Sequence, residues 1–170
     1  MDLASYIRNI PDFPRPGIQF KDITTLLKDG DAFRETINRL VDLFWDKGIE
    51  LIVGIEARGF IIGAPLAYEL RCGFVPVRKK GKLPAATLSK TYDLEYGSAT
   101  LEIHRDAIHP GQRVLIVDDL LATGGTTKAV CAMVEELGGN IVGVGFVIEL
   151  EALKGREKLS PHPVYSLIQL

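Results

Sequence analysis

Short runs of apolar residues alternate along this chain with longer stretches in which apolar residues recur every three or four positions. The short runs have the length of strands. Because nearly every position in them is apolar, they are typical of strands buried on both faces of a sheet. They occupy Leu51–Ile55, Phe74–Arg78, Val114–Val117, Ile141–Leu150 and Val164–Ile168.

Three of the longer stretches have the apolar spacing of helices. They cover Ala32–Lys47, Phe60–Leu70 and Lys128–Leu137. Buried strands that alternate with helices favour an α/β fold with a mostly parallel, doubly wound, Rossmann-like sheet. In such a sheet, ligands bind at the carboxyl ends of the strands.

Two parts of the chain do not follow this alternation. Near the N-terminus, Leu3–Asn9 has the spacing of a short helix, a stiff proline-rich loop follows, and Ile18–Ile23 is expected to be a short strand or extended arm. Further on, Leu83–Lys90 is expected to be a mobile surface loop, and Tyr92–Tyr96 with Ala99–His104 favours a β-hairpin. We expect the arm and the hairpin to form a small hood over the ligand site.

Composition and charge narrow the class of protein. The 170 residues, 46% hydrophobic and 25% charged, suit one domain spanning residues 1–170. The net charge of −2 gives no basic face for nucleic acid or an anionic membrane. Cys72 and Cys131 suggest neither a disulfide framework nor a zinc site. With no secretion signal and no long apolar span, we expect a soluble, cytoplasmic protein that binds no nucleic acid and no membrane.

The stretch Val114–Thr127, which reads VLIVDDLLATGGTT, carries the clearest chemistry. A buried strand leads into Asp118 and Asp119, then a short turn, and then Thr-Gly-Gly-Thr-Thr before a predicted helix. Glycines let the backbone approach a ligand, and the free N–H groups of a helix's first turn attract anions. A phosphate would bind the amides of Thr123–Thr127, while the two carboxylates accept hydrogen bonds from a sugar diol or hold a metal ion. Acidic pairs and Gly-Gly turns are each common in solvated loops, so the prediction depends on their order.

A second strand ends in a similar way. Leu51–Ile55 is followed by a Glu-Ala-Arg-Gly turn and then by a helix, so Arg58 lies where an anion would bind. The chain contains no GxxxxGK[ST] loop and no GxGxxG after a strand. The phosphate prediction therefore does not extend to ATP or NAD.

Taken as a whole, Val114–Thr127 resembles the ribose-phosphate signature of the type I phosphoribosyltransferases. Further segments, in the same order along nearly the whole chain, are similar to the adenine-specific members of that family. They are Asp12–Thr24, Glu56–Gly59, Arg78–Pro84, Leu94–Ile103 and Leu153–Lys158. The resemblance implies a purine salvage reaction that uses Mg²⁺ to convert adenine and 5-phosphoribosyl 1-diphosphate into AMP and pyrophosphate. It also implies a homodimer.

By this resemblance, each end of the diphosphate sugar has its own binding residues. The 5′-phosphate would be bound by Ala122, Thr123, Gly124, Gly125, Thr126 and Thr127. The pyrophosphate would be bound by Glu56, Ala57, Arg58, Gly59, Arg78, Lys79 and Lys82. Asp118 and Asp119 would contact the ribose hydroxyls and place negative charge near the cation that develops at the anomeric carbon. Mg²⁺ would bind mainly through the diphosphate sugar and water, with no direct protein ligand.

The acceptor base would be held by the arm and the hairpin. Adenine would be bound by Gln19, Phe20, Lys21 and Leu120, with Phe20 and Leu120 on its two faces. Glu95 would be the acid/base group for the purine ring, and Tyr96 would pack beside it when the loop after Lys82 closes and excludes water. The predicted catalytic residues are therefore Glu95, Asp118, Asp119 and Arg58.

Two other functions stay open. A phosphoribosyltransferase for guanine, xanthine, uracil or orotate would share the central stretch, although Asp12–Thr24 and Leu94–Ile103 weigh against it because base choice is expected there. A non-catalytic regulator would keep the fold to sense the diphosphate sugar. Some such regulators add a DNA-binding domain. We expect none here, because 170 residues leave no room for it and a net charge of −2 offers no basic face. The cations Arg58, Lys79 and Lys82, together with Glu95, favour an enzyme.

Overall fold

The computed structural model describes residues 1–94 and 96–170. The strands are β1 (Arg8–Pro11), β2 (Gln19–Asp22), β3 (Leu51–Ile55), β4 (Gly73–Lys79), β5 (Thr87–Asp93), β6 (Ser98–His104), β7 (Arg113–Leu121), β8 (Asn140–Glu149) and β9 (Val164–Gln169). The helices are η1 (Leu3–Tyr6), α1 (Thr24–Leu27), α2 (Gly30–Phe44), α3 (Arg58–Leu70), α4 (Gly125–Glu136), η2 (Glu151–Leu153) and α5 (Gly155–Leu159). Within the described ranges, no helix is both long and apolar enough to cross a membrane.

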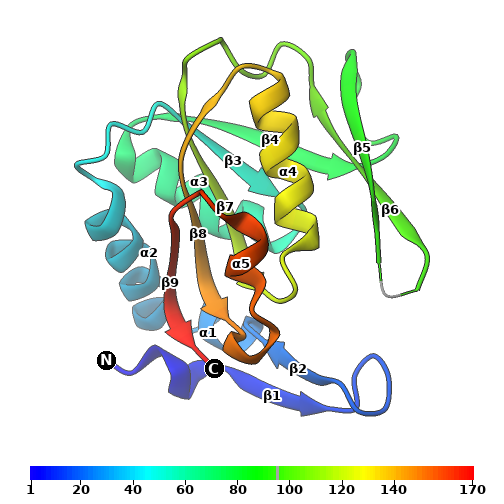
Figure 1. Cartoon of the computed structure of the whole chain (residues 1–170). Helices are drawn as coiled ribbons and strands as arrows, with labels where there is room; N and C mark the ends of the chain where they lie inside the picture. The colour runs from blue at the N-terminus through cyan, green and yellow to red at the C-terminus, as the bar shows by residue number, and fades with distance from the viewer. Residues whose placement is uncertain (95) are drawn as a thin grey trace.

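The central sheet has the strand order β5-β6-β4-β3-β7-β8-β9. Strands β4, β3, β7, β8 and β9 run parallel to one another. In contrast, β6 is antiparallel to β4, and β5 is antiparallel to β6. In Figure 1, α3 lies behind the sheet and α2 lies to its left, whereas α4 and α5 lie in front. Residues of α2 and α3 share one core with the sheet, and residues of α4 and α5 share the other. This arrangement confirms the predicted mostly parallel sheet that is covered by helices on both faces.

Each face of the sheet has its own hydrophobic core, and β7 contributes to both. Val114 and Ile116 pack into the core on the α4 face, and Leu115 and Val117 pack into the core on the α2 and α3 face. All four side chains are fully buried. Side chains alternate between the two faces along a strand, so only a strand covered on both sides is apolar at every position.

The N-terminal arm differs from its prediction. The helix predicted over Leu3–Asn9 ends at Tyr6, because Ile7 is extended and Arg8 begins β1. β1 pairs with β2 in a small antiparallel sheet of its own, with Asn9 opposite Lys21. Pairing with a strand from beyond the proline loop thus outweighs the local helical spacing, which is a weak determinant over one turn.

The hairpin is longer than predicted and extends the central sheet. Thr87–Lys90, expected to lie in a loop, forms the first half of β5, because Leu88 is buried in the core beside α4. The far end of the hairpin meets the arm, where the Arg15 guanidinium lies 4.3 Å from the centre of the Tyr96 ring. The base of the hairpin is therefore part of the sheet, and only its far end joins the arm as a hood.

Candidate active site

Two pockets lie at the carboxyl edge of the parallel strands, and they meet at Asp118. The first is lined by Glu56, Ala57, Arg58, Lys79, Asp118 and Asp119. The second is lined by Asp118, Leu120, Leu121 and the loop 122–127. The fold thus joins the two segments in which the sequence predicts anion binding, at the edge where an open α/β sheet binds its ligands.

The paired acids lie inside β7 rather than after it. β7 continues to Leu121, with Asp118 opposite Phe146 and Leu121 opposite Glu149 of β8. The predicted strand end at Val117 and the predicted turn from Leu120 are therefore wrong, because pairing with β8 keeps these residues extended. As a result, both carboxylates project from a strand that is paired with β8 here and with β3 up to Val117, which holds them more rigidly than a loop would.

The loop after β7 ends in the first turn of α4, which begins three residues earlier than predicted. Lys128 N donates to Gly124 O at 2.9 Å, so the amides of Gly125, Thr126 and Thr127 precede this first helical hydrogen bond. Such amides point out of the end of a helix and attract anions. Gly124 has the left-handed φ of 89°, whereas a Cβ built on Gly125 would meet no atom within 4 Å. Gly124 therefore makes the turn, and Gly125 leaves space in front of the amides.

Asp118 and Asp119 have different surroundings. Arg58 Nε donates to Asp119 Oδ2 at 2.6 Å, and Asp119 N donates to Asp118 Oδ1 at 2.8 Å. Burial raises the pKa of Asp118 well above its usual value, and the neighbouring charge of Asp119 raises it further. Burial opposes the charge of Arg58, but the hydrogen bond and attraction to Asp119 outweigh it and raise the pKa of Arg58. Arg58 and Asp119 thus form an ion pair beside a second carboxyl, that of Asp118, whose charged form burial disfavours.

The start of α3 packs closely against β7. A Cβ on Gly59 would lie 3.0 Å from Val117 O and 3.1 Å from Asp118 Oδ1. Such contacts are tighter than a side chain normally makes, so a glycine allows Arg58 to begin its helix directly beside the acids. This approach brings the two anion-binding turns together.

Glu56 gathers the basic residues of the first pocket. Its side chain is 8% exposed and accepts hydrogen bonds from Arg78 Nε at 3.0 Å, Lys79 N at 3.2 Å and Lys82 Nζ at 2.6 Å. Burial would raise the pKa of Glu56, but these donors outweigh burial and lower it. The Glu56 carboxylate therefore holds the cations in place.

Glu102 is a site-supporting residue that the sequence does not reveal. This buried carboxylate on β6 accepts hydrogen bonds from Gly81 N at 2.6 Å, Thr87 Oγ1 at 2.7 Å and Ser89 Oγ at 2.8 Å. These donors lower the pKa of Glu102. The turn that carries Lys82 is thereby tied to the base of the hairpin. Only the pairing of β4, β5 and β6 shows this role, because the donors come from distant parts of the sequence.

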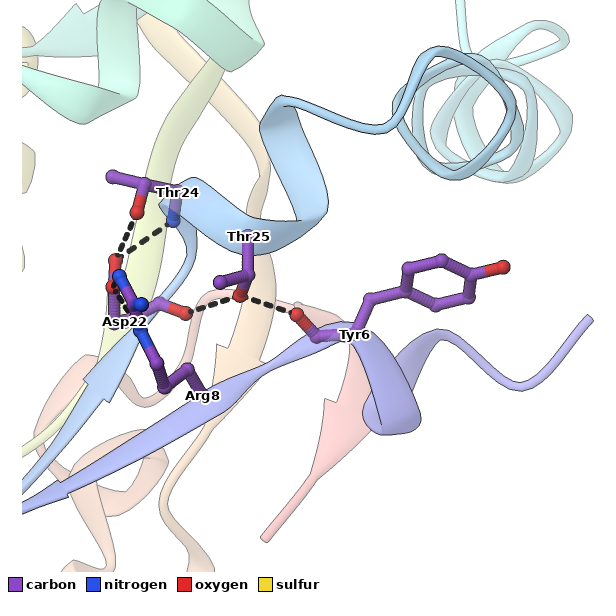
Figure 2. A network of polar contacts seen from close by, with 5 residues as sticks. All are labelled: Tyr6, Arg8, Asp22, Thr24 and Thr25. Atoms are coloured by element: carbon purple, nitrogen blue, oxygen red, sulfur yellow. Dashed lines mark hydrogen bonds and ion pairs between the residues drawn. The ribbon is translucent and has the colours of Figure 1, made fainter.

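A polar network fixes the base of the N-terminal arm (Figure 2). Asp22 accepts hydrogen bonds from Arg8 Nε at 3.0 Å, Thr24 N at 2.9 Å and Thr24 Oγ1 at 2.6 Å. The bonds from Thr24 and Arg8 lower the pKa of Asp22 to about 2. Thr25 Oγ1 donates to Tyr6 O at 2.5 Å, which ties α1 to η1. The arm is therefore anchored at one end by a carboxylate that stays charged at neutral pH.

The residues predicted to bind adenine lie on this anchored arm and beside the second pocket. Phe20 is half-buried, and the Arg58 guanidinium lies 5.9 Å from the centre of its ring. Asn9 of β1 binds the side chains of two residues on β2. Its amide donates to Gln19 Oε1 at 2.9 Å and accepts from Lys21 Nζ at 3.0 Å. Leu120 is half-buried and lines the pocket of the glycine loop.

The predicted acid/base residue Glu95 lies outside the described residues, so its role stays a prediction. Its neighbour Tyr96 is 68% exposed and stacks with Arg15 of the arm. A second link joins the hairpin to the glycine loop, where Thr126 Oγ1 donates to Tyr92 OH at 3.1 Å. The hairpin therefore contacts both the arm and the loop on either side of the site.

The donor set around the pockets suits a magnesium ion that arrives with its phosphates. Among the described residues, no group of three or more His, Cys, Asp or Glu side chains is placed to hold a metal ion. Mg²⁺ commonly binds proteins through one or two carboxylates while it keeps several waters and substrate phosphate oxygens. Asp118 and Asp119 supply two carboxylates at the point where the pockets meet.

The comparisons with known proteins agree with this geometry. Residues 19–168 match the family described as phosphoribosyl transferase domain. The adenine phosphoribosyltransferase of Chloroflexus aurantiacus is 62% identical over 168 residues, which cover 99% of this chain and 97% of that protein. The crystal structure of the Thermoanaerobacter pseudethanolicus enzyme of the same name superposes with a TM-score of 0.97 at 55% identity, and covers 99% of this chain and 98% of its own.

A third relative has ligands bound. The Saccharomyces cerevisiae adenine phosphoribosyltransferase, complexed with an imino-altritol bisphosphate and adenine, has a TM-score of 0.92 at 43% identity over 98% of this chain and 96% of its own. The chain therefore belongs to the phosphoribosyl transferase family, a class of glycosyltransferases. Within that family it groups with the adenine phosphoribosyltransferases, as the resemblance of its motifs implies.

The raised pKa of Asp118 predicts that the charged form of this side chain destabilises the folded protein. An acid whose pKa is higher in the folded than in the unfolded state destabilises the fold increasingly as pH rises above its unfolded value of about 4. Asp118→Asn removes this cost and keeps an oxygen to accept from Asp119 N. Its melting temperature should exceed that of the parent by a few degrees at pH 8, since one kcal/mol corresponds to roughly 2–4 °C at this size.

Calorimetry at pH 4.5 and pH 8 tests this expectation, with Asp42→Asn, an exposed carboxylate of α2, as the control. The difference in melting temperature between Asp118→Asn and the parent should be smaller at pH 4.5 than at pH 8. The turnover of Asp118→Asn should be about 100-fold lower than that of the parent. A lower melting temperature for Asp118→Asn at pH 8 would show that the charged carboxylate stabilises the fold instead.

Proposed function

We propose that this chain transfers a 5-phosphoribosyl group from 5-phosphoribosyl 1-diphosphate to adenine, giving AMP and pyrophosphate. The observation that carries the proposal is the meeting of two anion-binding turns at one pair of carboxylates. A sugar with a phosphate at one end and a diphosphate at the other carries one anionic group for each turn. The adenine-specific relatives support the choice of base.

The 5′-phosphate binds the loop after β7. Its oxygens accept hydrogen bonds from the amides at the start of α4 and from the threonine hydroxyls. The residues are Ala122, Thr123, Gly124, Gly125, Thr126 and Thr127. Because Gly125 has no side chain, the phosphate can approach the backbone directly.

The ribose lies over the paired acids. Asp118 and Asp119 accept hydrogen bonds from its 2′- and 3′-hydroxyls and stabilise the positive charge that develops as the bond to the diphosphate breaks. Arg58 holds Asp119 in place through its Nε and has further N–H groups with which to bind the leaving diphosphate. Catalysis is thus mainly positioning and charge stabilisation.

The diphosphate binds the first pocket. Glu56, Ala57, Arg58 and Lys79 line this pocket, and Gly59, Arg78 and Lys82 lie beside these residues, where Glu56 orients Arg78 and Lys82. Mg²⁺ that arrived with the diphosphate sugar would lie near Asp118 and Asp119, and it would neutralise phosphate charge on the leaving diphosphate. Lys82 exchanges its bond to Glu56 for the incoming phosphate oxygens as the following loop closes.

Adenine binds between the arm and β7. Phe20 and Leu120 cover its two faces, and backbone groups at Gln19 and Lys21 read its edge. Glu95 takes the proton that leaves the purine ring, and Tyr96 closes beside it. The anchored arm supports this role, because its base is fixed by Asp22 while the arm lies beside Arg58.

A homodimer is part of the proposal. Helix α3 presents Ile61 and Tyr68 to solvent, 44% and 82% exposed, on one helical face. Large exposed apolar side chains are common in subunit interfaces. Light scattering should give twice the mass of one chain, and a mass of 18.7 kDa would contradict the proposal. The highly charged diphosphate sugar does not cross membranes unaided, which fits a cytoplasmic enzyme.

The decisive assay measures product formed from 5-phosphoribosyl 1-diphosphate and adenine, first with Mg²⁺ and then with EDTA. AMP and pyrophosphate should form only with Mg²⁺. Hypoxanthine, guanine and uracil serve as competing acceptors, and turnover of guanine without turnover of adenine would assign another base. Tight binding of the diphosphate sugar without turnover of any base would favour a regulator.

A substitution at Gly125 tests the phosphate-binding loop. In Gly125→Val, the new side chain enters open space, so the fold should keep its melting temperature within about 2 °C, whereas the KM for 5-phosphoribosyl 1-diphosphate should rise at least tenfold. Gly30→Val is the matched control, because Gly30 is also the first residue of a helix with open space around it. An unchanged KM in Gly125→Val would place the phosphate elsewhere.

A further inference from the structure

The loop that binds the 5′-phosphate rests on α5. A Cβ on Gly124 would lie 2.6 Å from Gly155 O, and a Cβ on Gly155 would collide with Ala122 O and with the side chain of Leu121. The two backbones are therefore in direct contact, with no side chain between them. A shift of α5 would press on the loop or leave it without support.

An ion pair between the buried carboxylate of Glu149 and the partly exposed guanidinium of Arg156 holds α5 in this position. Arg156 Nε donates to Glu149 Oε1 at 2.7 Å, and Arg156 Nη2 donates to Glu149 Oε2 at 2.6 Å. The Glu149 side chain is 5% exposed, and Ser166 Oγ of β9 donates to its Oε2 at 2.6 Å. Two parallel bonds between a guanidinium and a carboxylate fix orientation as well as distance. The pair therefore sets the angle at which α5 meets the sheet.

The position of Glu149 connects this pair to the site. Glu149 ends β8 and lies opposite Leu121, the last residue of β7 before the phosphate loop. Leu150 N donates to Leu121 O at 3.0 Å, which continues the contact beyond the strands. Glu149 therefore lies next to the start of the loop. Its partner Arg156 directly follows Gly155, which touches the middle of the loop.

The function proposed above makes no use of this pair. Arg156 and Glu149 line neither of the two pockets at the site, and Arg58 and the lysines supply the cations there. An ion pair with one partner exposed to solvent is a poor source of net stability, because water screens the attraction and the buried carboxylate loses part of its hydration. The two parallel hydrogen bonds, in contrast, fix the orientation of Arg156 relative to Glu149.

We propose that Arg156 and Glu149 are positioning residues for the 5′-phosphate end of the substrate. They hold Gly155 against Gly124, so that the amides of the loop keep the spacing that a phosphate requires. The inference rests on the proposed function, since it takes the glycine loop as the phosphate site. It predicts a selective effect, because the diphosphate pocket around Arg58 is not supported by α5.

Two simple ligands separate the two ends of the site. Ribose 5-phosphate reports on the glycine loop, and pyrophosphate reports on the pocket of Arg58, with each Kd measured by calorimetry. Arg156→Met should weaken ribose 5-phosphate binding at least about tenfold and leave pyrophosphate binding within about twofold, because α5 touches the glycine loop, whereas Arg156 lines neither pocket and the two pockets share only Asp118. Arg156→Lys, which keeps the charge but loses the paired bonds, should lie between Arg156→Met and the parent.

Arg113→Met is the matched control. Arg113 also orders backbone through its guanidinium, donating to Lys47 O at 2.7 Å, but it lies at the start of β7, away from the site. It should lower the melting temperature and leave both Kd values unchanged. If Arg156→Met does not fold, Ser166→Ala removes one bond to Glu149, and it should weaken ribose 5-phosphate binding alone, by about two- to fivefold.

The outcomes distinguish the inference from the function it depends on. Equal weakening of both ligands by the Arg156 and Ser166 variants, or a loss of stability without any change in the Kd of ribose 5-phosphate, would overturn the positioning role. If the parent protein binds neither ligand, the proposed function itself fails. Selective loss of ribose 5-phosphate binding supports both.

Discussion

The site depends on the parallel pairing of β3 with β7. Leu51 lies opposite Val114 and Gly54 opposite Val117, so the two strands end at the same edge of the sheet. Each strand leads into a helix whose N-terminus faces that edge, α3 on one face and α4 on the other. Two anion-binding turns separated by more than sixty positions in the chain are thereby placed beside one pair of carboxylates.

Around this edge the protein satisfies its charged groups with one another. Arg58 is paired with Asp119, and Glu56 holds Arg78 and Lys82. Desolvating an unpaired charge is costly, so these pairs let a strongly charged pocket exist in a folded chain. Asp118 differs, because among the described residues its side chain accepts a backbone N–H bond but forms no ion pair, and burial raises its pKa. Stability is thus lowered at the point where the sugar is proposed to bind.

Much of this arrangement could be predicted from the sequence, for physical reasons that differ between elements. Buried strands such as β3 are apolar throughout, and a glycine loop before a helix is a local feature, so both are readable from short stretches. The extent of β7 and of β5 could not be predicted, because pairing with β8 and β6 decides where these strands end. Ion pairs such as Arg156–Glu149 depend on strand register and leave no periodic signal. The helix predicted over Leu3–Asn9 also ends early because of strand pairing, since β1 pairs with β2 from Arg8 onward.

The hairpin has a consequence for the outer boundary of the sheet. β5 is an edge strand, and a free edge offers unpaired N–H and C=O groups to any other chain in solution. Along β5, Ser89, Thr91 and Asp93 are exposed, and Lys90 is half-buried. Charged side chains on an edge strand, such as those of Lys90 and Asp93, disfavour pairing with a further strand. The hairpin that is proposed to cover the ligand therefore also limits association of the protein through this edge.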